Sequence, residues 1–101
     1  SGQVPRGLDG KPAHVGDAEA QMHLVWANLE KAVTAAGGTL KDIVKTTVYV
    51  VGTESLPAIR RARLALLPAE GRPTSTMLVV AALADPNFLV EVEAIAVLGG
   101  G

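Results

Sequence analysis

The 101-residue sequence contains no cysteine and few aromatic residues: one Trp, one Tyr and one Phe. Without cysteine the chain can form no disulfide, no zinc site built on thiolates and no thiol nucleophile. Lys and Arg total 9 against 10 Asp and Glu, which gives a formal charge of −1. Proteins that bind nucleic acids carry an excess of basic residues, and single-strand binders add aromatic side chains on which bases stack. The lack of a basic excess and the scarcity of aromatic residues disfavour a nucleic-acid-binding function.

The sequence also lacks a long apolar run. Its longest, residues 77–84, is well short of the roughly 20 residues that a membrane-spanning helix needs. We find no basic segment followed by an apolar core, the pattern of a secretory signal peptide. These absences predict a cytoplasmic protein.

Aliphatic residues, in contrast, are abundant. Hydrophobic residues make up 49% of the chain although aromatic residues make up only 3%. A domain of this size buries only about 65% of the surface that its unfolded chain exposes. We therefore expect the excess apolar surface to be either exposed or covered by another chain. The sequence contains no internal repeat or linker, so we predict one domain over residues 1–101.

The order of predicted elements indicates an α+β fold with two helices on one face of a sheet. Helices are predicted where apolar residues recur every three or four positions, and strands where β-branched residues dominate or alternate with others. In chain order we expect a loop over 1–16, a helix from an Asp17 N-cap to Gly37, a capped turn over 39–42, a strand over 44–51, a helix from a Ser55 N-cap to about Leu67, a turn over 68–73, and strands over 74–83 and 89–98.

Two of the predicted strands, 44–51 and 89–98, indicate how the faces of the sheet are covered. The weak alternation of the 44–51 strand predicts that it is covered on both faces. In the 89–98 strand, alternation predicts that Val90, Val92, Ala94, Ala96 and Leu98 point one way and that Leu89, Glu91, Glu93, Ile95 and Val97 point the other way. This second face combines aliphatic residues with two carboxylates and is too apolar to be simply solvated.

Two clusters of charged residues are candidates for a site. Glu91 and Glu93 should lie about 7 Å apart on one face, where one of them could act as a general acid or base; alternatively, they lie at the sheet edge or in an ion pair between subunits. Arg60 and Arg63 share one face of the second helix and Arg61 turns away. They form either a solvated surface or a site for a carboxylate, which a guanidinium binds with two hydrogen bonds. His14 and His23 lack metal-ligand spacing, so no metal is expected.

Several motifs resemble the RidA/YjgF family, also called the reactive-intermediate deaminase or L-PSP family. The resemblance spans essentially the whole chain. The matching segments, in order, are SGQVP at 1–5, Gln21 with Asn28-Leu29, AAG at 35–37, DIVKTTVYV at 42–50, RPTST at 72–76 and VEVEAIAV at 90–97. The most specific parts of the resemblance are the strand motif at 42–50 and the last segment at 90–97, at the separation that they have here.

The resemblance implies a chorismate-mutase-like fold assembled as a homotrimer, with small carboxylate-bearing metabolites bound in clefts between subunits. It implies hydrolysis of enamines and imines, such as 2-iminobutanoate and 2-iminopropanoate, to 2-keto acids and ammonia without a cofactor. Glu91 then places the attacking water, and backbone groups of Ser1, Gly2 and Met77 orient the substrate. The endoribonuclease activity also attributed to the family is disfavoured by the charge and by the few aromatic residues.

The sequence departs from the family pattern at two places. Ser75 stands where the family has the arginine that binds the substrate carboxylate, a contact that contributes about 1.5–3 kcal/mol. We hypothesise that Arg60, or Arg63, supplies the charge from another direction. The family also has a strand hairpin before the SGQ segment, which this sequence does not include, either because the sequence is trimmed to its ordered part or because the gene product is truncated. These departures leave two functions open: a deaminase with altered substrate binding, or a non-catalytic trimeric module that binds small metabolites.

Overall fold

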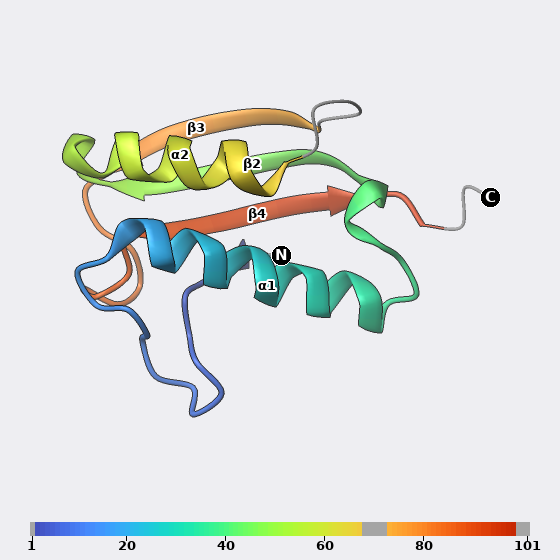
Figure 1. The fold of residues 1–101 in the computed structure, drawn as a ribbon, viewed down its shortest axis with the longest axis horizontal. Helices are drawn as coiled ribbons and strands as arrows, with labels where there is room; N and C mark the ends of the chain where they lie inside the picture. The colour runs from blue at the N-terminus through green and yellow to red at the C-terminus, as the bar shows by residue number, and fades with distance from the viewer. Residues whose placement is uncertain (1, 68–72, 99–101) are drawn as a thin grey trace.

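The structure, a computed structural model, describes residues 2–67 and 73–98. Its helices are α1 and α2, and its strands are β1 to β4 (Figure 1). In chain order the elements are β1 (Gly2–Gln3), α1 (Ala18–Ala35), a 3₁₀ turn (Leu40–Asp42), β2 (Ile43–Val51), a 3₁₀ turn (Thr53–Ser55), α2 (Leu56–Leu66), β3 (Thr74–Val80) and β4 (Val90–Ala96). Ser1 and residues 68–72 of the predicted turn lie outside the described residues.

The four strands form one mixed sheet in the order β1-β4-β2-β3. β4 is antiparallel to both β1 and β2, whereas β2 and β3 are parallel. Although β3 and β4 follow each other in the chain, they do not pair, because β2 lies between them. α1 and α2 pack side by side on one face of this sheet (Figure 1). The predicted α+β class, with two helices on one face, is confirmed.

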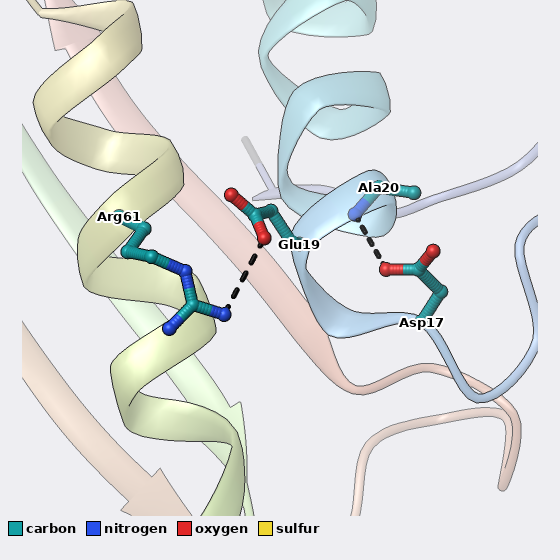
Figure 2. Close-up of polar contacts among 4 residues, drawn as sticks. All are labelled: Asp17, Glu19, Ala20 and Arg61. Carbon is teal, nitrogen blue, oxygen red and sulfur yellow. Dashed lines mark hydrogen bonds and ion pairs between the residues drawn. The ribbon is translucent and has the colours of Figure 1, made fainter.

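Local signals account for the ends of α1. The Asp17 carboxylate accepts a hydrogen bond of 3.0 Å from the Ala20 N–H, as an N-cap does (Figure 2). After the helix, Gly37 has φ 92°, a left-handed conformation that glycine adopts without steric cost. The predicted turn follows, in which the Asp42 carboxylate accepts from the Thr39 N–H at 2.8 Å. The sequence therefore located this helix and the turn after it correctly.

The hydrophobic core lies between the two helices and the sheet. Apolar residues that recur every three or four positions predict an apolar stripe for the first helix, and most of this stripe is buried in the core, although Ala32 and Ala36 are exposed. The stripe consists of Ala18, Met22, Val25, Trp26, Leu29, Ala32, Val33 and Ala36. The alternation predicted for the last strand is confirmed, with Val90 and Val92 fully buried on the helix side. Further core residues are Met22, Val25, Trp26, Leu29, Val48, Val50, Ile59 and Ala62.

Four sequence expectations need correction. Gly2–Gln3 form strand β1 within the predicted 1–16 loop, because they pair with the edge of β4, a distant segment. Ser55 holds the N-cap position of α2, but its backbone is already helical and its side chain makes no capping hydrogen bond. The last two strands are shorter than predicted. Within this chain, β2 is buried on its helix side and only partly covered on the other.

No helix among the described residues is long and apolar enough to cross a membrane.

Candidate functional site on the open face of the sheet

The face of the sheet that carries no helix, here called the open face, is defined by the strand register. Side chains of directly paired residues lie on the same face. One row across the sheet contains Gly2, Glu93, Thr47 and Thr76, because each is paired with the next. The neighbouring row contains Glu91, Tyr49 and Leu78. The rows beyond them contribute Lys45, Thr74 and Ile95 on one side and Val51 and Val80 on the other.

Glu91 lies on the open face and is half-buried. Its side chain extends along the sheet and covers Gly2: a Cβ atom built on Gly2 would lie 3.1 Å from Cδ of Glu91 and 3.4 Å from its Cγ. Tyr49 is its direct neighbour on β2. Among the described residues, the Glu91 carboxylate takes part in no ion pair. No cationic side chain in the described part of the chain therefore neutralises this carboxylate.

Glu93 lies in the adjacent row and is exposed. It is flanked by Gly2 on β1 and by Thr47 on β2. The structure thus brings together three of the residues singled out from the sequence: Gly2, Glu91 and Glu93. It adds Tyr49 and Thr47, which sequence analysis missed as site residues. The weak alternation of the 44–51 strand assigned them to no particular face, and only the register places them beside the two carboxylates.

Ser75 and Met77 lie on the opposite face of the sheet. Ser75 is paired with Thr46, which in turn is paired with Ala94, three residues from Glu91. Because neighbouring residues on a strand alternate between faces, an odd separation places Ala94, and hence Ser75, on the helix side. The Ser75 hydroxyl oxygen is buried and has no hydrogen-bond partner among the described residues. Met77 packs against the core.

The arginine cluster belongs to α2, which also lies on the helix side. Arg60 is exposed and Arg63 is half-buried. Arg61 forms an ion pair of 3.4 Å with Glu19 of α1 (Figure 2), an exposed contact of a kind that contributes about 0.2–1 kcal/mol. Within one chain the sheet separates Arg60 from Glu91, so the two side chains do not share a site.

Gln21 was identified from the sequence only as part of the family motif, and no structural role was predicted for it. It is fully buried, and its Nε2 donates to the carbonyl oxygen of Asn87 at 2.8 Å and to those of Ala13 and His14 at 3.3 Å. Its Oε1 accepts from the Leu89 N–H at 2.8 Å. Gln21 therefore ties the N-terminal segment to the residues just before β4, of which Leu89 lies two positions before Glu91. Its polarity within an apolar helix stripe was the available signal.

No cluster of three or more His, Cys, Asp or Glu residues able to hold a metal ion occurs in the described part of the chain. His14 and His23 are both exposed. The open face offers the carboxylates of Glu91 and Glu93, the ammonium group of Lys45, and the hydroxyl groups of Tyr49 and of the threonines beside them.

The fold and this face define a class: small α+β proteins with two helices on a mixed sheet and polar groups on the other face. The sequence model of the family described as Endoribonuclease L-PSP matches residues 1–98. The chain therefore belongs to this family, known also as RidA/YjgF, and the resemblance of its motifs is confirmed.

Individual relatives agree with this assignment. The 3-aminoacrylate deaminase RutC of Acinetobacter baylyi is 31% identical over 96 residues, which cover 95% of this chain and 75% of RutC. YyfB of Yersinia pestis, a Rid family protein of unknown function, has a TM-score of 0.87 and 34% identity over 97% of this chain and 75% of its own. TdcF of E. coli, solved with bound serine, has a TM-score of 0.84 and 30% identity over 96% of this chain and 76% of its own.

Proposed function

We propose that the chain is an enamine/imine deaminase that converts small 2-imino acids, of the 2-iminobutanoate and 2-iminopropanoate type, to 2-keto acids and ammonia. One observation carries the proposal: the Glu91 carboxylate lies on the open face over Gly2, without an ion pair to another described residue. Similarity to RutC, a 3-aminoacrylate deaminase, supports the same class of reaction. Residues 1–101 act as one domain.

In this reaction Glu91 serves as a general base. It accepts a proton from a water molecule whose oxygen bonds to the carbon of the C=N group, and the electron pair of that double bond moves to nitrogen. The proton held by Glu91 passes to the nitrogen and gives a carbinolamine, and Glu91 then accepts the hydroxyl proton and passes it to the same nitrogen. The C–N bond breaks, ammonia leaves, and the carbon–oxygen double bond forms. General base catalysis by a positioned side chain typically contributes 10²- to 10⁴-fold. Backbone groups of Ser1, Gly2 and Met77 orient the substrate, and no cofactor takes part.

The open face supports assembly into a homotrimer with the site between subunits. Ile95 is 55% exposed and Leu78 is 45% exposed in the single chain, and both belong to the open face. Large aliphatic side chains gathered beside functional polar groups mark a surface that another chain covers. In such an assembly Arg60 of a neighbouring copy, rather than of the same copy, could approach the substrate carboxylate.

Substrate binding differs from that of an arginine-containing relative. Ser75 carries no charge, and its hydroxyl is buried on the helix side. A charged hydrogen bond contributes about 1.5–3 kcal/mol, so losing it weakens binding or rate by roughly 10- to 150-fold. We therefore expect a high KM for simple 2-imino acids.

The experiment compares Glu91→Gln with Glu93→Gln. An amino-acid oxidase generates the imine in the assay, and the 2-keto acid formed above the spontaneous rate is measured. We expect Glu91→Gln to lower kcat at least 100-fold, because an amide accepts no proton from water. Glu93→Gln, a carboxylate of the same face, should retain activity within a few-fold. Equal activity of the wild type and Glu91→Gln would contradict the proposed base.

A second candidate function, a non-catalytic module that binds small metabolites, is favoured by the uncharged Ser75 and by the serine bound to TdcF. The two functions differ in a measurable way. A binding module shows no imine hydrolysis above the spontaneous rate, yet it binds serine or a small 2-keto acid in calorimetry. In that case Glu91→Gln should alter affinity and nothing else.

A further inference from the structure

We propose that Gly2 is a positioning residue for Glu91: the missing side chain at position 2 creates the space that the Glu91 carboxylate occupies. The steric part of this inference depends on the structure alone. Its catalytic consequence rests on the function proposed above.

The strand register makes this contact specific. Gly2 is paired with Glu93, and Gln3 with Val92, so Glu91 is a diagonal neighbour of Gly2 and not its partner. To reach Gly2, the Glu91 side chain must lean along the face of β4 toward the edge strand. A Cβ atom at residue 2 would lie 3.1 Å from Cδ and 3.4 Å from Cγ of Glu91, and closer still to Oε2. Carbon atoms at optimal van der Waals contact are about 3.5–4.0 Å apart, so the carboxylate would have to move.

The backbone gives no other reason for glycine at this position. Four glycines of the described chain have a positive φ, namely Gly10, Gly16, Gly37 and Gly52, and Gly2 is not among them. An alanine can therefore adopt the backbone conformation of residue 2. Replacing glycine by alanine at a compatible position usually stabilises a protein slightly, because it restricts the unfolded chain. A loss of function in Gly2→Ala would then reflect the displaced carboxylate and not unfolding.

Two neighbours constrain where the displaced side chain can lie along the sheet. Glu93 lies beside Gly2 in the same row, and a second carboxylate disfavours close approach by charge repulsion. On the other side lies Tyr49, the direct cross-strand neighbour of Glu91. Alanine at residue 2 should push the carboxylate away from the β1 edge and toward Tyr49. The water that Glu91 holds in the proposed reaction would move with it.

The test uses Gly2→Ala with Gly7→Ala as matched control. Gly7 also lies in the N-terminal segment and lacks a positive φ, and a Cβ there would meet only Asp9 Oδ1 at 3.3 Å and Ala13 Cβ at 3.9 Å. The first readout is the ¹³Cδ resonance of Glu91 in glutamate-labelled protein, assigned through Glu91→Gln. We expect this resonance to move in Gly2→Ala and to stay in place in Gly7→Ala. An unmoved Glu91 resonance in Gly2→Ala would overturn the inference.

The second readout is the rate of imine hydrolysis. Gly2→Ala should lower kcat about 10- to 100-fold with KM changed less than about threefold, as expected when an interaction made in the transition state is lost. In a Glu91→Ala background the same substitution should have no further effect on kcat, because no carboxylate remains to be displaced. An equal loss in both backgrounds would contradict a positioning role. If the resonance moves but no variant or wild type hydrolyses imines, the proposed function fails and the positioning of Glu91 by Gly2 stands.

Discussion

Gln21→Met should destabilise the protein strongly, although methionine matches glutamine in length and is itself a good core residue. Gln21 is 0% exposed, and its amide joins α1 to the segment before β4. Methionine keeps the packing volume but can neither donate to the Asn87 carbonyl nor accept from the Leu89 N–H. The substitution therefore isolates the hydrogen bonds from the packing.

The magnitude follows from the two short hydrogen bonds, both 2.8 Å long. Each buried polar group that loses its partner costs about 1–3 kcal/mol. The apolar thioether recovers part of this by adding buried apolar surface. We expect the free energy of unfolding to fall by about 2–4 kcal/mol, combining these terms. The two longer bonds, to Ala13 and His14 at 3.3 Å, add less.

The assay is urea unfolding followed by the fluorescence of the single tryptophan, with every variant at one protein concentration because an oligomer gains stability with concentration. At an m value of about 1–1.5 kcal/mol/M, the midpoint should fall by roughly 2 M with m unchanged. Glu30→Ala, at an exposed position of the same helix, should leave the midpoint nearly unchanged. A Gln21→Met midpoint equal to that of Glu30→Ala would refute the reasoning.

Two further outcomes follow from the two faces of the sheet. Ser75→Ala should leave the free energy of unfolding within about 1 kcal/mol of the wild type, because it removes a buried hydroxyl that has no described partner. Urea unfolding checks this, and a loss of about 2 kcal/mol or more would show that the hydroxyl makes a hydrogen bond. Ile95→Asp, at a side chain that is 55% exposed in the single chain, should lower the fraction of the proposed trimer at least tenfold in sedimentation at micromolar concentration, whereas Leu8→Asp, at a fully exposed leucine of the loop before α1, should not; equal behaviour of both variants would exclude the open face as the interface.

Sequence reasoning succeeded where the decisive interaction is local. The N-cap at Asp17 and the left-handed glycine at Gly37 mark the ends of α1 without reference to any other part of the chain. Alternation in β4 assigned Glu91 and Val92 to opposite faces because the side chains of a strand alternate whatever its partner. These features depend on residues no more than four positions apart.

Sequence reasoning failed where the structure of a segment depends on pairing with residues distant in the sequence. Gly2 and Gln3 contain no strand signal of their own and become β1 only through pairing with Glu93 and Val92. Gln21 sits in an apolar stripe, and nothing nearby reveals that its amide partners, Asn87 and Leu89, lie more than 60 positions away. Pairing over such distances depends on the assembled sheet, which no local pattern encodes.

The strand register alone determines on which face of the sheet Ser75 and Glu91 lie, and this placement limits whether the two residues can contact one substrate. The resemblance to the family implies that position 75 lies at the substrate carboxylate and that Glu91 lies at the reacting carbon of the same substrate. In this chain the register through Thr46 and Ala94 places them on opposite sides of a single sheet. A substrate of a few ångströms cannot contact both within one copy, so a site that uses both must combine the helix side of one copy with the open face of another. Glu91 and Gly2, by contrast, meet within one chain. Activity retained by a monomeric protein would thus assign the chemistry to the Glu91–Gly2 pair and leave position 75 without a part in it.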